Sequence, residues 1–504
     1  MLLRSLRCGK YLALAAATLL PVAGAAPAAL AARPDTRPQA QATSAAFTSY
    51  SLGESPGVTC PGSPQCSNYA AEPAIRADAA GNFYASSENG LGGGTVAFRS
   101  TDGGHHYTTL TSPDAGSSSN DSGFAPGGGD TDLATAPVAN SNGYDNVYVA
   151  SLSLANVDVS TSTDGGNTWS LNPIGASIPG DDREWIAADG ANKVCISYHD
   201  MATFNIDVNC SYDAGATFAQ LGDAIDSSHA FLVNDNEIGN LAIDPSSHVI
   251  YQVLSGIDNA GEATGGAGYH DVWIGVSTDG GKTFTDHQVY SNPDTSTDYG
   301  HQFVNVSVDK AGNVYAVFSD DHNLYYSWST DQGQTWSAPT QVNSAPSASA
   351  IMPWSVAGDA GKLDVVWYGT SYYDGTTSPD SYPSSTDWYV YFAQNTSATT
   401  PGSTFTQVTA TPVVHTGGVC ESGVSCTGNR DLYDDFGVAA SPTTGYASIV
   451  YSDDQYDPNG PNYSGCDPST TNTSSCDHTA IATQTSGTPI FGATALTHGQ
   501  KAMH

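Results

Sequence analysis

A short motif with the pattern Ser-x-Asp-x-Gly-x-Thr-aromatic recurs along the 504-residue chain and limits the folds that it can adopt. Four clear copies begin at Ser162, Ser211, Ser277 and Ser329, and a fifth copy, from Ser100, has lost the threonine. The Asp can accept backbone N–H bonds inside a turn, and the Gly can adopt the positive φ that a tight turn needs. The aromatic residue can then bury between strands. Each copy therefore predicts a structural hairpin turn, to which we assign no catalysis.

Strand-like runs organise the chain around these turns. Two such runs, 72–78 and 82–86, precede the first copy, and each later copy is preceded in the same way. The repeating unit is therefore four short strands with the motif between the third and the fourth. Strand pairs without a clean motif occur at 354–368 and 436–451. We predict an all-β propeller of four-stranded blades, with seven blades preferred over six. The units begin near Glu72, Asp130, Asp182, Glu237, His301, Met352 and Asp434.

The motif matches the Asp-box, or BNR repeat, and the chain resembles secreted proteins of the sialidase-like neuraminidase superfamily. This resemblance implies six blades, so our count of seven departs from it. It also implies three arginines that hold a substrate carboxylate, a tyrosine nucleophile activated by a glutamate, and an aspartate that acts as acid and base. The first blade begins Glu72-Pro-Ala-Ile-Arg76 rather than with the Arg-Ile-Pro of the family.

The N-terminus has the pattern of an export signal, because basic residues precede an apolar run that ends near Gly24 and a small-residue cleavage site follows. No later stretch approaches the roughly 20 apolar residues of a membrane helix, so we expect a secreted protein with no membrane insertion. The run 46–52 could close the ring as the fourth strand of the last blade. The expected organisation is a signal peptide at 1–31, a flexible segment at 32–45, one propeller domain at 46–495 and a tail at 496–504.

Cysteine content and net charge further restrict the compartment and the partners that we expect for this protein. Without Cys8 of the signal, eight of the nine cysteines remain. In an oxidising compartment they predict local disulfides, with zinc as the alternative. The net charge of -36 disfavours nucleic acid as a partner, although it also fits a solubility adaptation. We expect a monomer. The predicted pairs are Cys60–Cys66, Cys195–Cys210, Cys420–Cys426 and Cys466–Cys476.

One face of the propeller should carry the function. The motif turns lie on the other face, while the segments that lead into each blade and the loops between second and third strands lie on this one, where variable loops can build a site. These segments bring carboxylates, arginines and aromatic residues together, which suits sugar chemistry. The candidate catalytic residues are Asp182, Arg183, Glu184, Glu237, Arg430 and Tyr433. The candidate substrate-binding residues are Arg76, Asp132, Asp235, His301, Trp354 and Asp435.

Two interpretations remain open for these side chains. Glu184 and Glu237 could act as acid and base, because neighbouring carboxylates raise one another's pKa. Arg183 and Arg430, with Arg76 as the third arginine, could bind a sugar carboxylate. The alternative is structural: acidic residues at strand starts also cap turns, and the arginines could form ion pairs. Only the structural alternative predicts that Arg183→Ala lowers the melting temperature.

The expected function is that of a glycoside hydrolase of the exo-sialidase type, which acts on terminal acidic sugars of a glycan or glycoconjugate. A non-catalytic propeller that binds glycans or proteins, and a scaffold that is acidic only for solubility, are the alternatives. This chemistry requires no cofactor. A calcium site is kept open at Asp454 and Asp457, whose loop offers oxygen ligands and a glycine.

Overall fold

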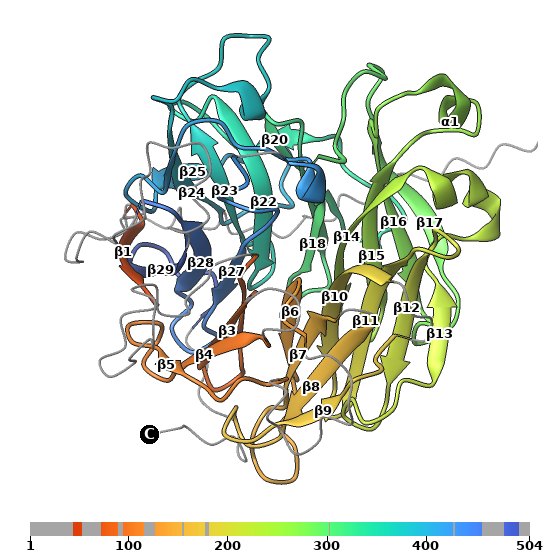
Figure 1. The fold of residues 1–504 in the computed structure, drawn as a ribbon, viewed down its shortest axis with the longest axis vertical. Coiled ribbons are helices and arrows are strands. Elements are labelled where there is room, and N and C mark those ends of the chain that lie inside the picture. The colour runs from red at the N-terminus through yellow and green to blue at the C-terminus, as the bar shows by residue number, and fades with distance from the viewer. Residues whose placement is uncertain are drawn as a thin grey trace, which may run out of the picture. The chain divides into compact units, whose positions relative to one another are not determined.

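The computed structural model describes residues 44–52, 72–88, 94–114, 127–153, 156–176, 181–301, 303–426, 429–455 and 478–492. In this part of the chain, seven antiparallel sheets of at least four strands surround a common centre (Figure 1). The first strands of neighbouring sheets contact each other and form the inner ring. The all-β propeller and the count of seven blades are therefore confirmed, and the six blades that the resemblance implied are not found.

The blades follow one another in chain order. Blade 1 contains β2 (Ala74–Ala77), β3 (Phe83–Ser87), β4 (Val96–Ser100) and β5 (Thr108–Thr109). Blade 2 contains β6 (Thr131–Thr135), β7 (Val147–Leu152), β8 (Val157–Ser162) and β9 (Ser170–Asn172). Blade 3 contains β10 (Asp181–Asp189), β11 (Lys193–Asp200), β12 (Ile206–Ser211) and β13 (Gln220–Asp223). Blade 4 contains β14 (Asn236–Ile243), β15 (Ile250–Gly256), β16 (Asp271–Ser277) and β17 (Thr285–Ser291).

The remaining blades continue the series. Blade 5 contains β18 (Asn305–Val308), β19 (Val314–Ser319), β20 (Leu324–Ser329) and β21 (Thr340–Gln341). Blade 6 contains β22 (Ser349–Ala357), β23 (Leu363–Thr370), β24 (Asp387–Asn395) and β25 (Thr406–Thr409), and β26 (His415–Thr416) also pairs with β24. Blade 7 contains β27 (Gly437–Ala440), β28 (Ala447–Asp453), β29 (His478–Ser486) and the N-terminal β1 (Ala46–Ser51). The described helical turns are α1 (Glu262–Gly265), η1 (Ser227–Asn234), η2 (Pro379–Ser381) and η3 (Gly423–Ser425).

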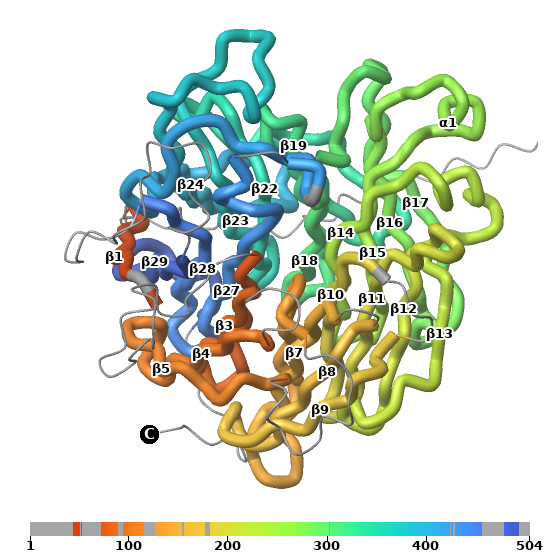
Figure 2. Tube along the Cα trace, in the orientation of Figure 1, coloured from red at the N-terminus to blue at the C-terminus, as the bar shows by residue number. Residues whose placement is uncertain are grey.

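The N-terminal strand closes the ring. β1 pairs antiparallel with β29, so that Tyr50 lies opposite Ile481. Figure 2 shows the red β1 beside the blue β29. The Tyr50 hydroxyl then donates a hydrogen bond of 2.6 Å to the carbonyl of Gly104 in blade 1. The prediction that 46–52 completes the last blade is confirmed. β1 is therefore the outermost strand of blade 7, and its Tyr50 ties that blade to the blade beside it.

The repeated motifs form the predicted turns. In blade 2, Asp164 Oδ1 accepts N–H bonds from Asn167 (3.1 Å) and Thr168 (2.9 Å). Gly166 has a φ of 87°, and a Cβ there would lie 2.8 Å from Leu110 of blade 1. The glycine is thus required both by its conformation and by the close approach of the neighbouring blade. The other four motif glycines, Gly104, Gly215, Gly281 and Gly333, also pack on the preceding blade.

Two of the predicted disulfides lie in the described residues. Cys195 and Cys210 occupy directly paired positions on β11 and β12, and they are bonded. Cys420 and Cys426 close a loop between β26 and β27. Both pairings are confirmed, whereas Cys60–Cys66 and Cys466–Cys476 lie outside the described residues. No helix in the described part of the chain is long and apolar enough to cross a membrane.

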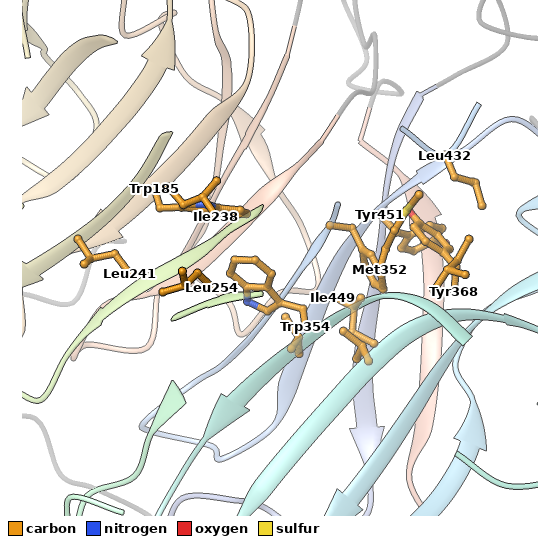
Figure 3. Packing of buried hydrophobic residues seen from close by; sticks show 14 of the residues in the cluster. Trp185, Ile238, Leu241, Leu254, Met352, Trp354, Tyr368, Leu432, Ile449 and Tyr451 are labelled. Carbon is orange, nitrogen blue, oxygen red and sulfur yellow. The ribbon is translucent and has the colours of Figure 1, made fainter. Parts of the chain in front are cut away.

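Aromatic rings fill the centre of the ring of blades. Trp185 of β10 and Trp354 of β22 approach to 5.2 Å between ring centroids, among the aliphatic side chains that Figure 3 shows. Phe303 packs edge-on against Trp185 at 5.6 Å. Trp354 also lines a cavity of about 570 Å³, whose other lining residues are mainly small apolar residues of the inner strands. We call Trp185, Trp354 and Phe303 the aromatic plug.

We expect Asp279→Ala to destabilise the protein by about 1 kcal/mol, because the turn loses a carboxylate that accepts several of its hydrogen bonds. Although partial burial acts to raise it, the pKa of Asp279 is lowered to about 2 by hydrogen bonds from Thr283, Ser277 and Lys282. Thermal or urea denaturation measures the change. Asp387→Ala, at an exposed position where β24 starts, is the matched control and should leave stability unchanged. Equal stability of the two variants would contradict a structural role for the motif.

Candidate functional site

Acidic side chains converge on the face opposite the motif turns. They come from the segments that lead into blades 1, 2, 3, 4 and 7 and from loops between second and third strands. Five of the seven glutamates of the chain lie here, in a protein that otherwise avoids this residue type. We call the following residues the mouth cluster: Glu72, Glu88, Asp130, Asp182, Glu184, Glu237, Glu421, Asp434 and Asp435, with Arg183 and Arg430.

Backbone geometry at the start of β10 places Arg183. The pairing of β10 with β11 shifts register between Asp182 and Glu184, so Arg183 has no partner residue on β11. Its φ is 47°, in the left-handed region that residues with a side chain seldom adopt. Such a bulge re-aims a side chain. The guanidinium consequently lies over the Trp185 ring, with its central carbon 4.3 Å from the ring centroid.

Carboxylates surround the buried Arg183 guanidinium. Nη1 lies 2.5 Å from Glu72 and 3.4 Å from Asp130, and Nη2 lies 2.5 Å from Asp435. Only 7% of the Arg183 side chain is exposed. Burial acts to lower the pKa of Arg183, but Asp435 and Glu72 raise it well above its ordinary value. Arg183 is therefore a permanent cation whose charge is matched by its neighbours.

Arg430 shares one of these carboxylates. Its Nη2 lies 3.2 Å from Oε1 of Glu72 and also forms an ion pair with Asp434. The central guanidinium carbon lies 5.5 Å from the centroid of the Tyr433 ring, and Tyr433 itself has a φ of 57°. Arg183 and Arg430 thus meet at Glu72, which links blade 3 to the segment leading into blade 7.

Arg76 occupies a different position. It forms a salt bridge of 2.9 Å with Asp132 on the neighbouring inner strand, and it lies beside the Trp354 ring. Asp132 also accepts N–H bonds from Leu133 (2.8 Å) and Ile186 (3.1 Å). The structure therefore pairs Arg76 with Asp132 inside the ring of blades, rather than with Glu72 as it pairs Arg183 and Arg430.

Two glutamates of the mouth cluster have strongly raised pKa values. Burial raises the pKa of Glu237 to about 8, with the Asp182 carboxylate as the next cause. Burial also raises the pKa of Glu88 to about 8, with Asp130 as the next cause. Both side chains are only partly buried. Carboxyl groups that hold a proton near neutral pH and still face solvent are typical of acid–base sites.

Glu184 differs from these two residues in its surroundings. It is 1% exposed, and neither carboxylate oxygen has a hydrogen-bond partner among the described residues. Burial and the Asp130 carboxylate raise its pKa well above the ordinary value. Since an isolated buried charge is costly, Glu184 is expected to be neutral in the folded protein.

The remaining candidate residues differ in their exposure and in their partners. Asp182 is exposed, and Asp235 is partly exposed. His301 is 52% exposed and lies 3.3 Å from Asp321, whose hydrogen bond is the main cause that raises the pKa of His301 to about 9. Trp354 belongs to the buried plug. Asp435 contacts Arg183, and burial raises its pKa to about 7.

The candidate calcium ligand Asp454 is already engaged. One oxygen lies 2.7 Å from Nδ1 of His415, and the other accepts a bond from Gln455. Nε2 of His415 lies 3.0 Å from the Gly418 carbonyl, so both ring nitrogens face acceptors and His415 offers no lone pair to a metal. This contact holds the segment between blades 6 and 7, which carries Arg430, in place. Asp457 lies outside the described residues.

Glu72, Glu88 and Asp130 also come close enough to be considered for a metal ion. One carboxylate oxygen from each lies within 4.8 Å of the others. Both oxygens of Glu72, however, contact arginine side chains. Because arginine side chains already pair with the Glu72 carboxylate, we assign no metal ion to these three residues. Neither Glu72 nor Glu88 was among the candidate site residues that the sequence indicated.

Comparisons with known proteins name no family for this chain. No family model matches the chain, and no curated protein matches it. Solved structures that resemble it include a GH93 α-L-arabinofuranosidase of Fusarium graminearum with arabinobiose, at 16% identity over 61% of this chain and 91% of that chain, with a TM-score of 0.42. A GH74 xyloglucanase from Xanthomonas campestris is 14% identical over 83% of this chain and 55% of its own, with a TM-score of 0.46.

An intramolecular trans-sialidase from Ruminococcus gnavus also resembles this chain. It is 13% identical over 79% of this chain and 93% of its own, with a TM-score of 0.36. Similarity at these levels says nothing about the activity of this chain. Its function has to be argued from the mouth cluster itself.

We expect Arg183→Ala to lower the free energy of unfolding by about 3–5 kcal/mol, because it leaves Glu72 and Asp435 buried without their cation. Chemical denaturation of the purified variant measures this loss. Lys282→Ala, in an exposed motif turn, removes a cation without a buried partner and should change stability little. An unchanged melting temperature for Arg183→Ala would show that the geometry around Arg183 is not a structural ion-pair network.

Stability should also fall as the pH rises from about 5 to 9. Burial raises the pKa of Asp207 to about 7 and that of Asp453 to about 8, as it does for Glu88 and Glu237. Each raised pKa contributes stability that is complete below the unfolded value of about 4 and is lost as the pH passes the folded value. Calorimetry across this range measures the trend. A melting temperature that increases towards pH 9 would contradict it.

Proposed function

We propose that this protein is a secreted carbohydrate-active propeller and that the mouth cluster is the active site of a glycoside hydrolase. The environment of Glu237 supports this most directly. Its side chain is partly exposed, and burial together with the Asp182 carboxylate raises its pKa to about 8. Glycoside hydrolysis needs one carboxyl group that can donate a proton and a second that is ionised. Glu237 and Asp182 fit these two roles.

In this proposal Glu237 protonates the leaving-group oxygen, and Asp182 acts on the sugar as base or nucleophile. Asp182 is exposed at the start of β10 and can therefore reach a bound substrate. Its pKa is raised by desolvation and by Asp130, and Arg183 acts in the opposite direction. Arg183 thus has an electrostatic role in keeping carboxylates ionised, in addition to its structural one.

An exo-sialidase would need guanidinium groups that are free to bind the substrate carboxylate. Here Arg183 is buried among three carboxylates, Arg430 pairs with two, and Arg76 pairs with Asp132. These ion pairs already satisfy the arginines, so the mouth cluster offers them poorly to an anionic sugar. We therefore propose an uncharged sugar as substrate, with a terminal sialic acid as the competitor to be tested.

The proposed location rests on the disulfides and on the expected export signal. Cys195–Cys210 and Cys420–Cys426 fit an oxidising compartment. Secretion agrees with a glycan or glycoconjugate as the partner. A non-catalytic propeller that binds glycans through the same face remains the second candidate, and turnover distinguishes the two.

We expect a panel of chromogenic glycosides to reveal hydrolysis of an uncharged sugar, and Glu237→Gln to lower kcat by about 10²- to 10⁴-fold. The amide keeps the shape of the side chain but cannot donate the proton. Asp182→Asn should show a loss of similar size. Glu262→Gln, in α1 outside the mouth cluster, is the matched control and should retain activity.

Three other results would change the proposal. Hydrolysis of sialosides alone would restore the exo-sialidase interpretation. Glycan binding without turnover would favour the non-catalytic propeller. Full activity of Glu237→Gln in an active protein would move the acid role to Glu88, whose pKa burial also raises to about 8.

A further inference from the structure

A second feature of the same face is a stacked pair of rings beside the mouth cluster. Tyr373 lies in the loop between β23 and β24, and His322 lies between β19 and β20. Their ring centroids are 3.7 Å apart, and the ring planes differ by 21°. Tyr373 is nevertheless 40% exposed. The two loops therefore hold a large aromatic surface flat against a neighbouring blade while leaving it open to solvent.

Hydrogen bonds make the loop around Tyr373 rigid. Asp374 accepts N–H bonds from Thr376 (3.0 Å) and Thr377 (2.8 Å), and the Thr377 hydroxyl donates to the same carboxylate at 2.5 Å. Tyr372 packs edge-on against Tyr382 with 4.8 Å between centroids. An exposed ring that is already ordered loses little conformational entropy when a ligand stacks on it.

Tyr382 lies beside the stacked pair, with its hydroxyl 3.5 Å from Nδ1 of His322. The Tyr382 hydroxyl lies 2.6 Å from Ser349 Oγ. Burial raises the pKa of Tyr382, and the carboxylates of Asp321 and Glu421 contribute to the shift. Burial likewise raises the pKa of Glu421, with Asp321 and then Asp434 as further causes. Glu421 therefore interacts electrostatically both with Tyr382 and with Asp434, the ion-pair partner of Arg430.

The chemistry of this surface fits an uncharged sugar ring. Burial lowers the pKa of His322, so the imidazole beneath Tyr373 is neutral at pH 7. The pair therefore presents an aromatic face without charge, on which the apolar C–H face of a sugar can stack while its hydroxyl groups remain hydrated. The surrounding carboxylates disfavour an anionic ligand here.

We propose that Tyr373, supported by His322, is the binding platform for a second, uncharged sugar unit of a glycan whose bond is cleaved at the mouth cluster. This inference rests on the proposed function and specifies its substrate class. The substrate is an oligosaccharide or polysaccharide, and the platform sets the affinity for the part of the chain beyond the cleaved bond.

The test compares long and short substrates with the full chain. The probes are neutral polysaccharides (a β-glucan, a mannan and a xylan) and the aryl monoglycoside that the parent protein hydrolyses best. We expect Tyr373→Ala to lower kcat/KM on the polysaccharide by about tenfold, which corresponds to about 1.4 kcal/mol. The value on the aryl monoglycoside should stay within about twofold of the parent, because that substrate does not reach the platform. Tyr373→Phe should retain the parent activity on both.

Tyr212→Ala is the matched control. Tyr212 is 55% exposed, but it belongs to a motif turn on the opposite face. Equal effects of Tyr373→Ala and Tyr212→Ala on the polysaccharide would overturn the platform and leave the proposed function standing. Equal losses on both substrates would also overturn it, since Tyr373 would then affect the site as a whole. A parent protein that neither hydrolyses nor binds any of these glycans would overturn the proposed function, and the platform with it.

Discussion

The pairing of β1 with β29 is the interaction on which the rest of the structure depends. It completes blade 7 and, through the Tyr50 hydroxyl, fastens that blade to Gly104 of blade 1. Glu72 leads into blade 1 and Asp435 leads into blade 7, so the mouth cluster spans the place where the ring closes. Arg183 reaches both carboxylates from blade 3. Without closure these acids would lose their common cation, and the mouth cluster would lose its arrangement.

Local backbone strain directs these side chains towards one another. Glu72, Arg183 and Tyr433 have φ values of 46°, 47° and 57°, although none is a glycine. Left-handed conformations of this kind cost about 1–2 kcal/mol per residue and persist only where the surroundings hold them. At Arg183 the ion pairs and the stacking on Trp185 supply that support. The strain and the ion pairs at Arg183 therefore depend on each other.

The repeats predicted most of the fold, because each motif specifies its turn through residues within the same eight positions. The strand at 46–52 and the Cys195–Cys210 bond also followed from local patterns. The partners of the charged residues did not. Arg183 and Glu72 are 111 positions apart, and Arg430 and Glu72 are 358 apart, so their contacts depend on how blades meet. A sequence pattern shows that arginines and acids share a face, but it does not show that Arg76 turns inwards to Asp132.

Acidic side chains either hold a turn or exchange a proton in this protein. The number of hydrogen-bond donors around each carboxyl group decides between these two roles. Asp279 receives two backbone N–H bonds and two hydroxyl bonds in its turn, which together outweigh the opposing effect of burial and lower its pKa to about 2. At Glu237, burial and Asp182 outweigh Arg183 and raise the pKa to about 8. A carboxylate of the first kind stays ionised and holds a turn, whereas a carboxyl group of the second kind can exchange a proton near neutral pH. Because the propeller places its motif turns on one face, the opposite face is free to gather acids whose charge is not fixed by the backbone.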